Sequence, residues 1–507
     1  MNHLLKKLLV RFALLPLVAA TASLGAEDFY VAQTAKGAGT GTSAVNAYAV
    51  SFFNTASNWA TGTGKIGAGD TVHLVGTITT ALTVQGSGTS GSPITILFEP
   101  GSVLTSPAWG VDAAGAIYMS SKSYVTIDGA SVGVIECSAN GDGLAKTQPA
   151  TGIFLSSCTN CAVQNLTIRN IYVHIYNTTN AIGTYTTQCI KASNCNSLTI
   201  KNNILNNAYL GVYVYTEKAI AISGFDISNN TITACSTAAV VACGSGSGDS
   251  ISNINFNGND ITMGLNWYDT PNANHIDGIH TWTSGGVMSN LRIYDNYFHG
   301  QAGDHCTAQI YVTDNLTTSY IYNNIIVGSI AAPGEGYINL NLTGTANAYL
   351  FNNTIVGIGS SNTGGNGIAF DPSRAGTTAH LKNNIIMNCY IGLYDATGAI
   401  TWDSDYNLFY NCGSVGRTSS FWTTLANWKT VTGGDMNSVS ENPLLLNDYK
   451  IPLTSPAVGK GVNLSGYFTT DKVGTTRPAT AAWDIGAFTG VAVQPTRATI
   501  SITTTPL

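Results

Sequence analysis

Short runs in which hydrophobic and polar residues alternate recur along most of the chain. Residues 198–200 (Leu-Thr-Ile), 254–256 (Ile-Asn-Phe) and 291–293 (Leu-Arg-Ile) are typical of these runs. A period of two residues places successive side chains on opposite faces of a β-strand, so that one face can be buried. None of the runs has the spacing of an amphipathic helix. The pattern therefore predicts an all-β protein.

An asparagine marks the same place in consecutive units of this pattern. The spacings between these asparagines are 27, 29, 37, 28, 29, 31 and 23 residues, and self-similarity at such a period is the signature of a repeat architecture. Units of this length with several short strands fit the coils of a parallel β-helix. Because asparagine tolerates left-handed backbone geometry and its amide can bond to the equivalent residue one coil away, we expect an interior asparagine ladder. The repeated residues are Asn203, Asn230, Asn259, Asn296, Asn324, Asn353, Asn384 and Asn407.

The first residues have the features of an export signal. Lys6, Lys7 and Arg11 precede an apolar run over residues 12–20, and the small residues after this run offer a cleavage site. A membrane anchor needs about 20 apolar residues, and this run is shorter. We therefore expect a secreted, periplasmic or cell-surface protein that has no integral membrane segment once the signal is removed.

The composition excludes several other classes of protein. Hydrophobic residues make up 44% of the 507-residue chain and charged residues only 9%, against about 25% charged residues in ordinary soluble domains. A disordered chain or a coiled coil would carry far more charge, and the net charge of −6 is not typical of a nucleic-acid-binding protein. We expect a monomer without a nucleic-acid partner.

Segments on both sides of the repeats point to one superfamily. Residues 47–60 form an amphipathic stretch and residues 123–129 lead into the repeats, whereas residues 455–461 and 483–487 follow them. With these segments the chain resembles the right-handed parallel β-helix superfamily that contains pectate lyases, polygalacturonases and many secreted carbohydrate-active proteins. The resemblance implies a single-stranded right-handed parallel β-helix, a solenoid with an N-terminal amphipathic cap and an irregular C-terminal cap over its open ends. The expected division is a signal peptide at 1–26, the N-terminal cap with the first strands at 27–80, the β-helix at 81–413 and a C-terminal capping segment at 414–507.

A second strand in each coil carries aromatic and amide side chains. If Ile153, Val212, Val240, Ile279, Ile310, Ile338 and Ile368 point inward, the alternation directs their neighbours outward. Rings in line with amides suit a polysaccharide, because the apolar face of a pyranose packs on rings and its hydroxyls need polar partners. The alternative is that these residues serve strand propensity and solubility. The candidate substrate-binding residues are Tyr213, Tyr215, Trp282, Gln309, Tyr311 and Asn339.

The densest group of titratable residues lies in the longest repeat and the one after it. Asp277 and His280 follow an insertion, and Asp304 and His305 come one coil later. Residues 274–279 and 303–306 resemble the Asn-Thr-Asp and Gly-Asp-Asp blocks of polygalacturonase-like hydrolases, with Ile276 and His305 as departures and without a later Gly-His-Gly or Arg-Ile-Lys block. Glycoside hydrolysis needs one carboxylic acid and one carboxylate, which Asp277 and Asp304 can supply. The two histidines would then modulate or share the proton transfer.

Two other functions fit the same residues. In a β-eliminating polysaccharide lyase, His280 would be the base, and Ca²⁺ held by Asp269, Asp277 and Asp304 would neutralise a uronate. A non-catalytic carbohydrate-binding or surface-adhesion module would use the same face without turnover. We favour the hydrolase, which requires no cofactor, over the lyase.

The ten cysteines raise the question of disulfides. Cys235, Cys389 and Cys412 each follow a repeated asparagine by five residues, and the last two fall in successive coils. Stacked strands lie about 4.8 Å apart, which is within the Cα separation of a disulfide. We expect Cys389 and Cys412 to be bonded or stacked, and a ladder of buried free thiols is the alternative.

Overall fold

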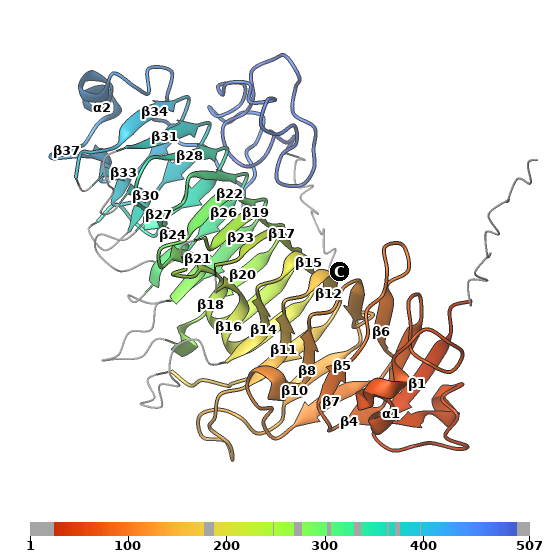
Figure 1. The fold of residues 1–507 in the computed structure, drawn as a ribbon. Helices are drawn as coiled ribbons and strands as arrows, with labels where there is room; N and C mark the ends of the chain where they lie inside the picture. Colours follow the sequence, from red (N-terminus) through yellow and green to blue (C-terminus); the bar gives the residue numbers. More distant parts are fainter. Residues whose placement is uncertain are drawn as a thin grey trace, which may run out of the picture.

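The computed structural model describes residues 25–176, 187–217, 219–246, 248–267, 276–301, 306–328, 336–361, 365–370, 376–395 and 397–493. Within these ranges the chain winds into a long stack of parallel strands, seen along its length in Figure 1. Crossover connections between parallel strands are almost always right-handed. The fold is a right-handed parallel β-helix, and the all-β solenoid expected from the sequence is confirmed.

One strand of each coil belongs to the first sheet. In the described residues this sheet has 14 strands, and neighbouring strands come from successive coils. The strands are β2 (Tyr48–Ala49), β1 (Asp28–Ala32), β3 (Thr71–Val75), β6 (Ile94–Phe98), β9 (Val125–Asp128), β12 (Thr159–Gln164), β15 (Asn196–Lys201), β17 (Ala221–Ser228), β19 (Ser250–Asn257), β22 (Val287–Tyr294), β25 (Thr318–Tyr322), β28 (Ala346–Phe351), β31 (Thr377–Lys382) and β34 (Thr401–Asp405).

The second sheet follows the first sheet within each coil, and the third sheet follows the second. The long strands β16 (Ile204–Thr216) and β18 (Thr231–Cys243) run through both, so the described strands of these two sheets join into one 23-stranded network. The second sheet also holds β4 (Thr77–Ile78), β7 (Val103–Ser106), β10 (Val134–Cys137), β13 (Thr167–Arg169), β20 (Asp260–Met263), β23 (Tyr297–Gly300), β26 (Ile325–Val327), β29 (Thr354–Val356), β32 (Ile385–Met387) and β35 (Leu408–Tyr410). The third sheet holds β5 (Leu82–Val84), β8 (Ile117–Ser120), β11 (Thr151–Ser156), β14 (Gln188–Ser193), β21 (Ile276–Thr283), β24 (Cys306–Asp314), β27 (Gly336–Leu342), β30 (Asn366–Phe370), β33 (Ile391–Asp395) and β36 (Ser414–Arg417).

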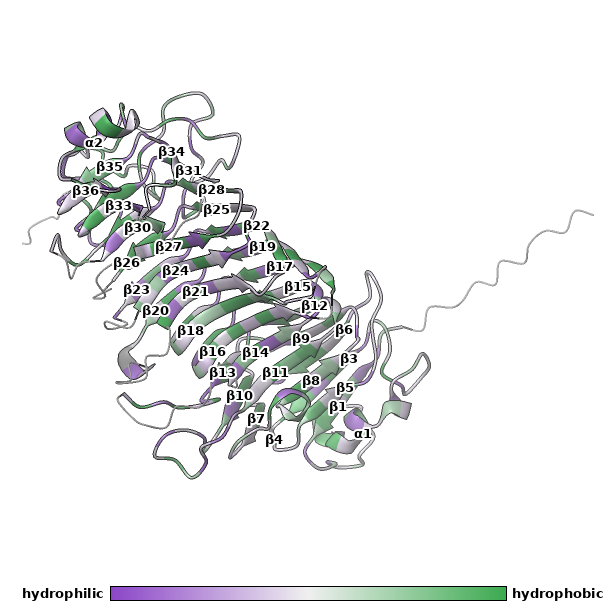
Figure 2. Ribbon diagram, turned by 60° about the vertical axis from the view of Figure 1, so that its left-hand side comes forward, coloured by the Kyte–Doolittle hydropathy of each residue, from purple (hydrophilic) through white to green (hydrophobic). Residues whose placement is uncertain are grey.

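Alternation along the strands separates the core from the surface. In the first sheet Ile96, Ile127, Val163 and Ile200 stack in register, and all four are completely buried. The neighbouring Thr126 faces outward and is only partly buried. Figure 2 shows the same alternation of hydrophobic and hydrophilic residues along many strands. Removing these aliphatic columns from water is the main force that holds the coils together.

The repeated asparagines form a ladder at the turn between the first and second sheets. Asn324 is representative: its Nδ2 donates to Asn353 Oδ1 at 3.0 Å and to the Ile293 carbonyl at 2.9 Å, and its Oδ1 accepts from the Asn296 backbone N–H at 3.1 Å. All eight repeated asparagines are at most 1% exposed. The interior ladder is therefore confirmed. The left-handed geometry instead falls on the preceding residue, for example Asn323 with φ of 55°.

Short elements cover both ends of the stack. At the first coils, α1 (Val50–Asn54) buries Phe53, whose ring meets Trp59 edge-on at a centroid distance of 4.9 Å. At the last coils, β37 (Phe421–Trp422) pairs antiparallel with β36, and α2 (Leu425–Thr432) buries Trp428. Further 3-10 helices are η1 (Ala44–Asn46), η2 (Ala56–Asn58), η3 (Asp112–Ala114) and η4 (Leu265–Trp267).

Residues 439–493, which we call the C-terminal segment, fold back along the corner between the first and second sheets. Figure 1 shows this segment in blue beside the later coils. Asn383 Nδ2 donates to the Val462 carbonyl at 2.8 Å, and Asn383 Oδ1 accepts from the Val462 N–H at 2.8 Å. One coil earlier, Asn352 Nδ2 donates to the Asp484 carbonyl at 3.0 Å. The turn asparagines thus bind the C-terminal segment along the helix.

No helix within the described residues combines the length and the apolar character needed to cross a bilayer. The predicted signal peptide falls almost entirely on residues 1–24, which lie outside the described residues.

Candidate functional site

The outward face of the third sheet carries a straight row of side chains, one from each coil. Neighbouring members of the row are stacked strand on strand, about 4.8 Å apart. The row is therefore long enough to follow an extended polymer. In order along the helix its members are Phe154, Lys191, Tyr213, Val240, His280, Tyr311 and Asn339.

Asp277 and His280 form a pair in this row, both on β21. Asp277 Oδ2 lies 3.5 Å from His280 Nδ1. Asp277 Oδ1 accepts a hydrogen bond from the Ala308 backbone N–H at 3.2 Å. The side chain of Asp277 is 0% exposed and that of His280 is 11% exposed. The Asp277 carboxylate thus lies beside Nδ1 of the imidazole, and in the protonated form of His280 the two groups attract each other.

A register shift between β21 and β24 creates the position of Asp277. Ile276 pairs with Cys306, but Asp277 pairs with Ala308, so Thr307 is an extra residue on β24. Such a bulge disrupts the regular ladder and re-aims a side chain. The shift brings the Ala308 N–H onto the Asp277 carboxylate. Bulges of this kind occur next to active sites.

Aromatic rings surround the pair. The His280 ring centroid is 4.7 Å from that of Tyr311 and 5.0 Å from that of Trp282. Two coils earlier, Tyr213 and Tyr215 stack with centroids 4.9 Å apart. All four neighbouring rings are partly exposed. They offer the apolar surface on which sugar rings pack.

Lys191 brings a positive charge to the same row and was not among the residues expected there. Its Nζ lies 2.5 Å from Asp112 Oδ1 and 5.2 Å from the centroid of the Phe154 ring. Lys191 occupies the place of Tyr213 one coil earlier. The alternation of residues 188–193 could have revealed it, because that run has the same in-and-out pattern as residues 210–215.

Two expected side-chain directions are wrong. Val240 pairs with His280 and so belongs to the outward row, whereas Ala239 takes the inward place beside Ile279. Gln309 is 1% exposed. Its Nε2 lies next to Gly328, only 2.8 Å from the position that a Cβ on this glycine would take. Other coils have a glycine at the equivalent place. A Cβ added to each of these glycines would contact an isoleucine of the second sheet: Ile168 for Gly152, Ile232 for Gly211 and Ile386 for Gly367.

A side chain at the position of Gln309 therefore points into the corner between the second and third sheets. A strict period of two cannot predict such a turn, because the alternation is interrupted there. Gln309 does not lie on the outward face, and its role as a substrate-binding residue is not supported. Tyr213, Tyr215, Trp282, Tyr311 and Asn339 do lie on the outward side, with Asn339 almost completely buried.

Three predicted site residues lie outside the described residues: Asp269, Asp304 and His305. The geometry of an Asp277–Asp304 pair and of a Ca²⁺ site that includes Asp269 is therefore a matter of proposal. Among the described residues no group of three or more His, Cys, Asp or Glu side chains is placed to hold a metal ion.

A second buried cluster lies where loops join the second and third sheets. Tyr172 donates a hydrogen bond to Asp142 Oδ1 at 2.5 Å, and His174 Nδ1 forms an ion pair with Asp142 Oδ2. The ring of Trp267 stacks on His174 with centroids 4.3 Å apart. Trp267 also meets Tyr209 edge-on at 5.2 Å, next to the strand that carries Tyr213. Asp142, Tyr172, His174 and Trp267 come from three different loops and Tyr209 from β16, and no spacing in the sequence indicates their proximity.

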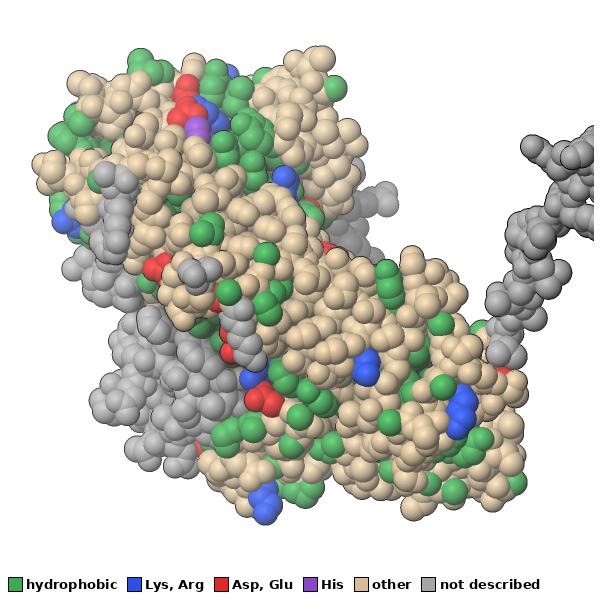
Figure 3. All heavy atoms as spheres, viewed as in Figure 1, with side chains coloured by type: hydrophobic (Ala, Val, Ile, Leu, Met, Phe, Trp, Pro, Cys, Tyr) green, Lys and Arg blue, Asp and Glu red, His purple; other side chains and the backbone are tan. Residues whose placement is uncertain are grey.

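Charged side chains are sparse around the molecule. The view in Figure 3 shows them as isolated spots on a surface of mostly uncharged atoms. On a surface with so few charges, Lys191 and the Asp277–His280 pair are conspicuous in the third-sheet row.

The two cysteines expected to be bonded or stacked are free thiols at stacked positions of adjacent coils. Cys389 is buried and Cys412 is partly exposed. They follow the paired residues Met387 and Tyr410 of β32 and β35, so they occupy equivalent places in adjacent coils. Equivalent side chains of parallel strands point the same way, so the two thiols lie side by side, and a disulfide between them would require the two Cβ–S bonds to rotate toward each other.

Comparisons with known proteins give a likeness in fold. No family model and no curated protein sequence matches the chain. Among solved structures, a GH136 lacto-N-biosidase from Eubacterium ramulus aligns with a TM-score of 0.48 and 12% identity over 82% of this chain and 67% of that chain. The pectate lyase Pel9A aligns with a TM-score of 0.41 and 12% identity over 92% and 97%. A tailspike protein of E. coli bacteriophage HK620 aligns with a TM-score of 0.39 and 10% identity over 74% and 68%. At these identities the likeness concerns the fold alone.

Proposed function

We propose that the protein is a polysaccharide-degrading enzyme that holds its substrate along the outward row of the third sheet and cleaves it at the Asp277–His280 pair. The observation that carries this proposal is the buried pair itself, flanked by Trp282 on the same strand and by Tyr311 one coil later. A purely adhesive surface has no need of a buried carboxylate aimed at an imidazole. Enzymes place such pairs where a proton must be moved.

The first chemistry we propose is glycoside hydrolysis by Asp277 and Asp304. Asp304 precedes Cys306 by two residues, and Cys306 pairs with Ile276, the neighbour of Asp277. The chain steps from Asp304 to Cys306, across to Ile276 and on to Asp277 limit the distance between the two aspartate Cα atoms to about 16 Å. The carboxyls of a hydrolase pair are about 5 to 10 Å apart. His280 and His305 would then assist by sharing the proton.

A second chemistry, β-elimination, is favoured by the orientation of His280. Its Nδ1 faces Asp277, and in a lyase Nε2 would be the nitrogen that takes a proton from a sugar carbon. A lyase would also need a cation to neutralise the uronate carboxylate. Ca²⁺ bound through Asp269, Asp277 and Asp304 would supply it, because Ca²⁺ takes oxygen ligands.

The test is to incubate the purified protein with a panel of neutral and uronate polysaccharides, with Ca²⁺ or with a chelator. New reducing ends without the ultraviolet absorbance of an unsaturated product would support the hydrolase. Both signals together, lost with the chelator, would support the Ca²⁺-dependent lyase. Binding without either signal would overturn the enzyme proposal in favour of a carbohydrate-binding module.

Substitutions at Asp277 and His280 test whether these two residues carry the activity. Asp277→Asn and His280→Ala are expected to lower kcat by about 10² to 10⁴, the usual contribution of a positioned acid or base. The matched control is His380→Ala. His380 also pairs with an aspartate, Asp403, at 2.8 Å and stacks on Tyr349, but on the outer side of the first sheet. It should retain kcat within about twofold, and equal losses in all three variants would refute the assignment.

A further inference from the structure

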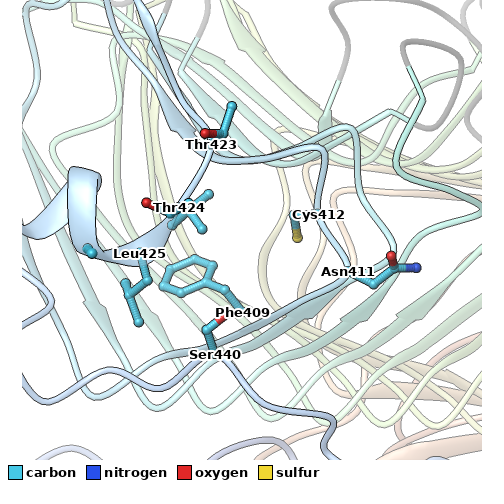
Figure 4. A pocket seen from close by; sticks show the side chains of 9 residues that line it. Phe409, Asn411, Cys412, Thr423, Thr424, Leu425 and Ser440 are labelled. Atoms are coloured by element: carbon cyan, nitrogen blue, oxygen red, sulfur yellow. The ribbon is translucent and has the colours of Figure 1, made fainter.

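A cavity of about 330 Å³ lies between the last coil and α2. Figure 4 shows its lining: Phe409 and Leu425 on one side, Thr423 and Asn411 on the other, and the sulfur of Cys412 among them. The lining mixes apolar surface with hydroxyl and amide groups. Cys412 is the one cysteine of the described residues that is not fully buried. Because Cys412 lines the cavity, a small molecule that enters the cavity comes next to its side chain.

Cys389 lies directly behind Cys412, one coil earlier. The backbone N–H of Gly413 donates to the Cys389 carbonyl at 3.0 Å, which ties the two coils together at this place. Cys389 is 0% exposed, so it has no access of its own to solvent. Parallel neighbours have Cα atoms about 4.8 Å apart, inside the range that a disulfide spans. The thiol of Cys412, at the cavity, thus lies next to the enclosed thiol of Cys389, with which it can form a disulfide.

The pKa values of the two thiols are shifted in opposite directions. A hydrogen bond from Cys389 lowers the pKa of the Cys412 thiol. Burial raises the pKa of Cys389 well above its usual range. The thiolate is the reactive form of cysteine, and reactive cysteines combine a lowered pKa with access and a nearby resolving thiol.

We propose that Cys412 is a thiol–disulfide exchange site for small organic disulfides that enter the cavity, with Cys389 as the resolving thiol. In the first step the Cys412 thiolate attacks one sulfur of the small disulfide, a mixed disulfide forms, and one small thiolate leaves. In the second step the Cys389 sulfur attacks the Cys412 sulfur, the mixed disulfide breaks, and the proton of Cys389 passes to the second small thiolate, which leaves as a thiol. Two protein thiols are oxidised to one disulfide, and one small disulfide is reduced to two thiols.

The chain contains a matched internal control. Cys158 and Cys195 are also neighbours in adjacent coils, and the Cys158 N–H points at Cys195 Sγ at 3.4 Å. Hydrogen bonds from neighbouring thiols lower the pKa of Cys158 to about 4, yet both cysteines are only 1% exposed. This pair shares the stacking and the acidity of the proposed site but lacks the cavity. It therefore separates the effect of access from that of acidity.

The experiment treats the full chain with cystamine and follows each cysteine by peptide mapping without reduction. The expected result is a Cys389–Cys412 crosslink that forms at least about tenfold faster than any modification of Cys158 or Cys195. In Cys389→Ser the reaction should stop at a cysteamine adduct on Cys412, and in Cys412→Ser the residue Cys389 should remain a thiol. Thiol-reducing agents should reverse the crosslink.

Two outcomes would overturn the proposal. One is modification of Cys412 no faster than that of Cys158 in the unaltered protein, a comparison that does not depend on how the variants fold. The other is oxidation of Cys389 in Cys412→Ser at the unaltered rate, which would mean that the cavity is not the route to this pair.

Discussion

Asp295 is one of the left-handed turn residues that directly precede the ladder asparagines. Most of these turn residues are themselves asparagines, whereas Asp295 carries a carboxyl group. Burial under the C-terminal segment raises the pKa of Asp295 to about 7, against the smaller opposing effects of Asn323 and Lys472. Lys472 does not pair with the carboxylate, since its Nζ donates to the Asp295 backbone carbonyl. Asp295 Oδ1 is buried without a hydrogen-bond partner among the described residues. Ionising this carboxyl therefore costs stability.

We expect Asp295→Asn to stabilise the protein in a pH-dependent way. A carboxyl whose pKa is raised in the folded state contributes stability that is fully present below pH of about 4 and is lost as the pH rises through about 7. Asparagine cannot ionise, so the variant should equal the wild type at acidic pH and exceed it at pH of about 8, by about 1 to 3 kcal/mol. Urea unfolding across this pH range measures the difference.

The control for this prediction is Asp448→Asn. Asp448 is exposed, and its hydrogen bond with Lys450 lowers rather than raises its pKa. Its contribution would be lost only as the pH falls, so this variant should gain nothing at alkaline pH. A gain of Asp295→Asn that is independent of pH would contradict the explanation through ionisation.

At the scale of the element, the asparagine ladder joins the coils at their sharpest turn. Asn324→Ala removes the hydrogen bonds that its side chain makes with the Ile293 carbonyl and with the backbone N–H and the side-chain amide of Asn296, all of them buried. Unsatisfied buried groups cost about 1 to 3 kcal/mol each, so we expect a loss of about 3 to 5 kcal/mol in unfolding free energy. Denaturant unfolding with an unchanged m-value would measure this loss.

The control for the ladder is Asn202→Gly. Asn202 has φ of 57° and is exposed, and glycine accepts this backbone geometry. Its replacement should change the free energy of unfolding by about 0.5 kcal/mol or less. Equal losses in Asn202→Gly and Asn324→Ala would mean that the turn, and not the interior ladder, carries the stability.

The strands and the ladder could be predicted from the sequence because each depends on a local period. The alternation in residues 198–200 indicates a buried face, and the spacing of the asparagines reflects the length of one coil. His280 was placed correctly because its neighbours alternate without a break. Gln309 was not, because an extra residue, Thr307, and a bend into the corner interrupt the period before it. The cluster around Asp142 depends on loops whose contacts leave no periodic signal.

At the scale of the whole molecule, the second sheet explains why the chain turns back on itself. In its later coils the second sheet has apolar residues on both faces, as in Ile325-Ile326, Ile385-Ile386 and Leu408-Phe409. Consecutive apolar pairs indicate a strand that is buried on both sides. The C-terminal segment supplies the missing cover, with Ile485 packed on Ile385 and Leu408. The consecutive apolar pairs therefore indicate, from the sequence alone, that another segment covers the outer face of the second sheet. An analysis that looks only for alternating apolar and polar residues does not detect them.

The attachment of this segment can be tested at Asn383. Asn383→Gly keeps a backbone with φ of 60° but removes both hydrogen bonds to Val462. Two lost bonds are worth about 2 kcal/mol, so local opening of residues 439–493 should become about thirtyfold more frequent. Limited proteolysis under native conditions should cleave the segment correspondingly faster while the coils stay intact. Asn229→Gly removes an amide at a left-handed turn residue that precedes the coils covered by the segment, and it should leave the cleavage rate unchanged. If both variants are cleaved at the wild-type rate, apolar packing alone holds the segment in place.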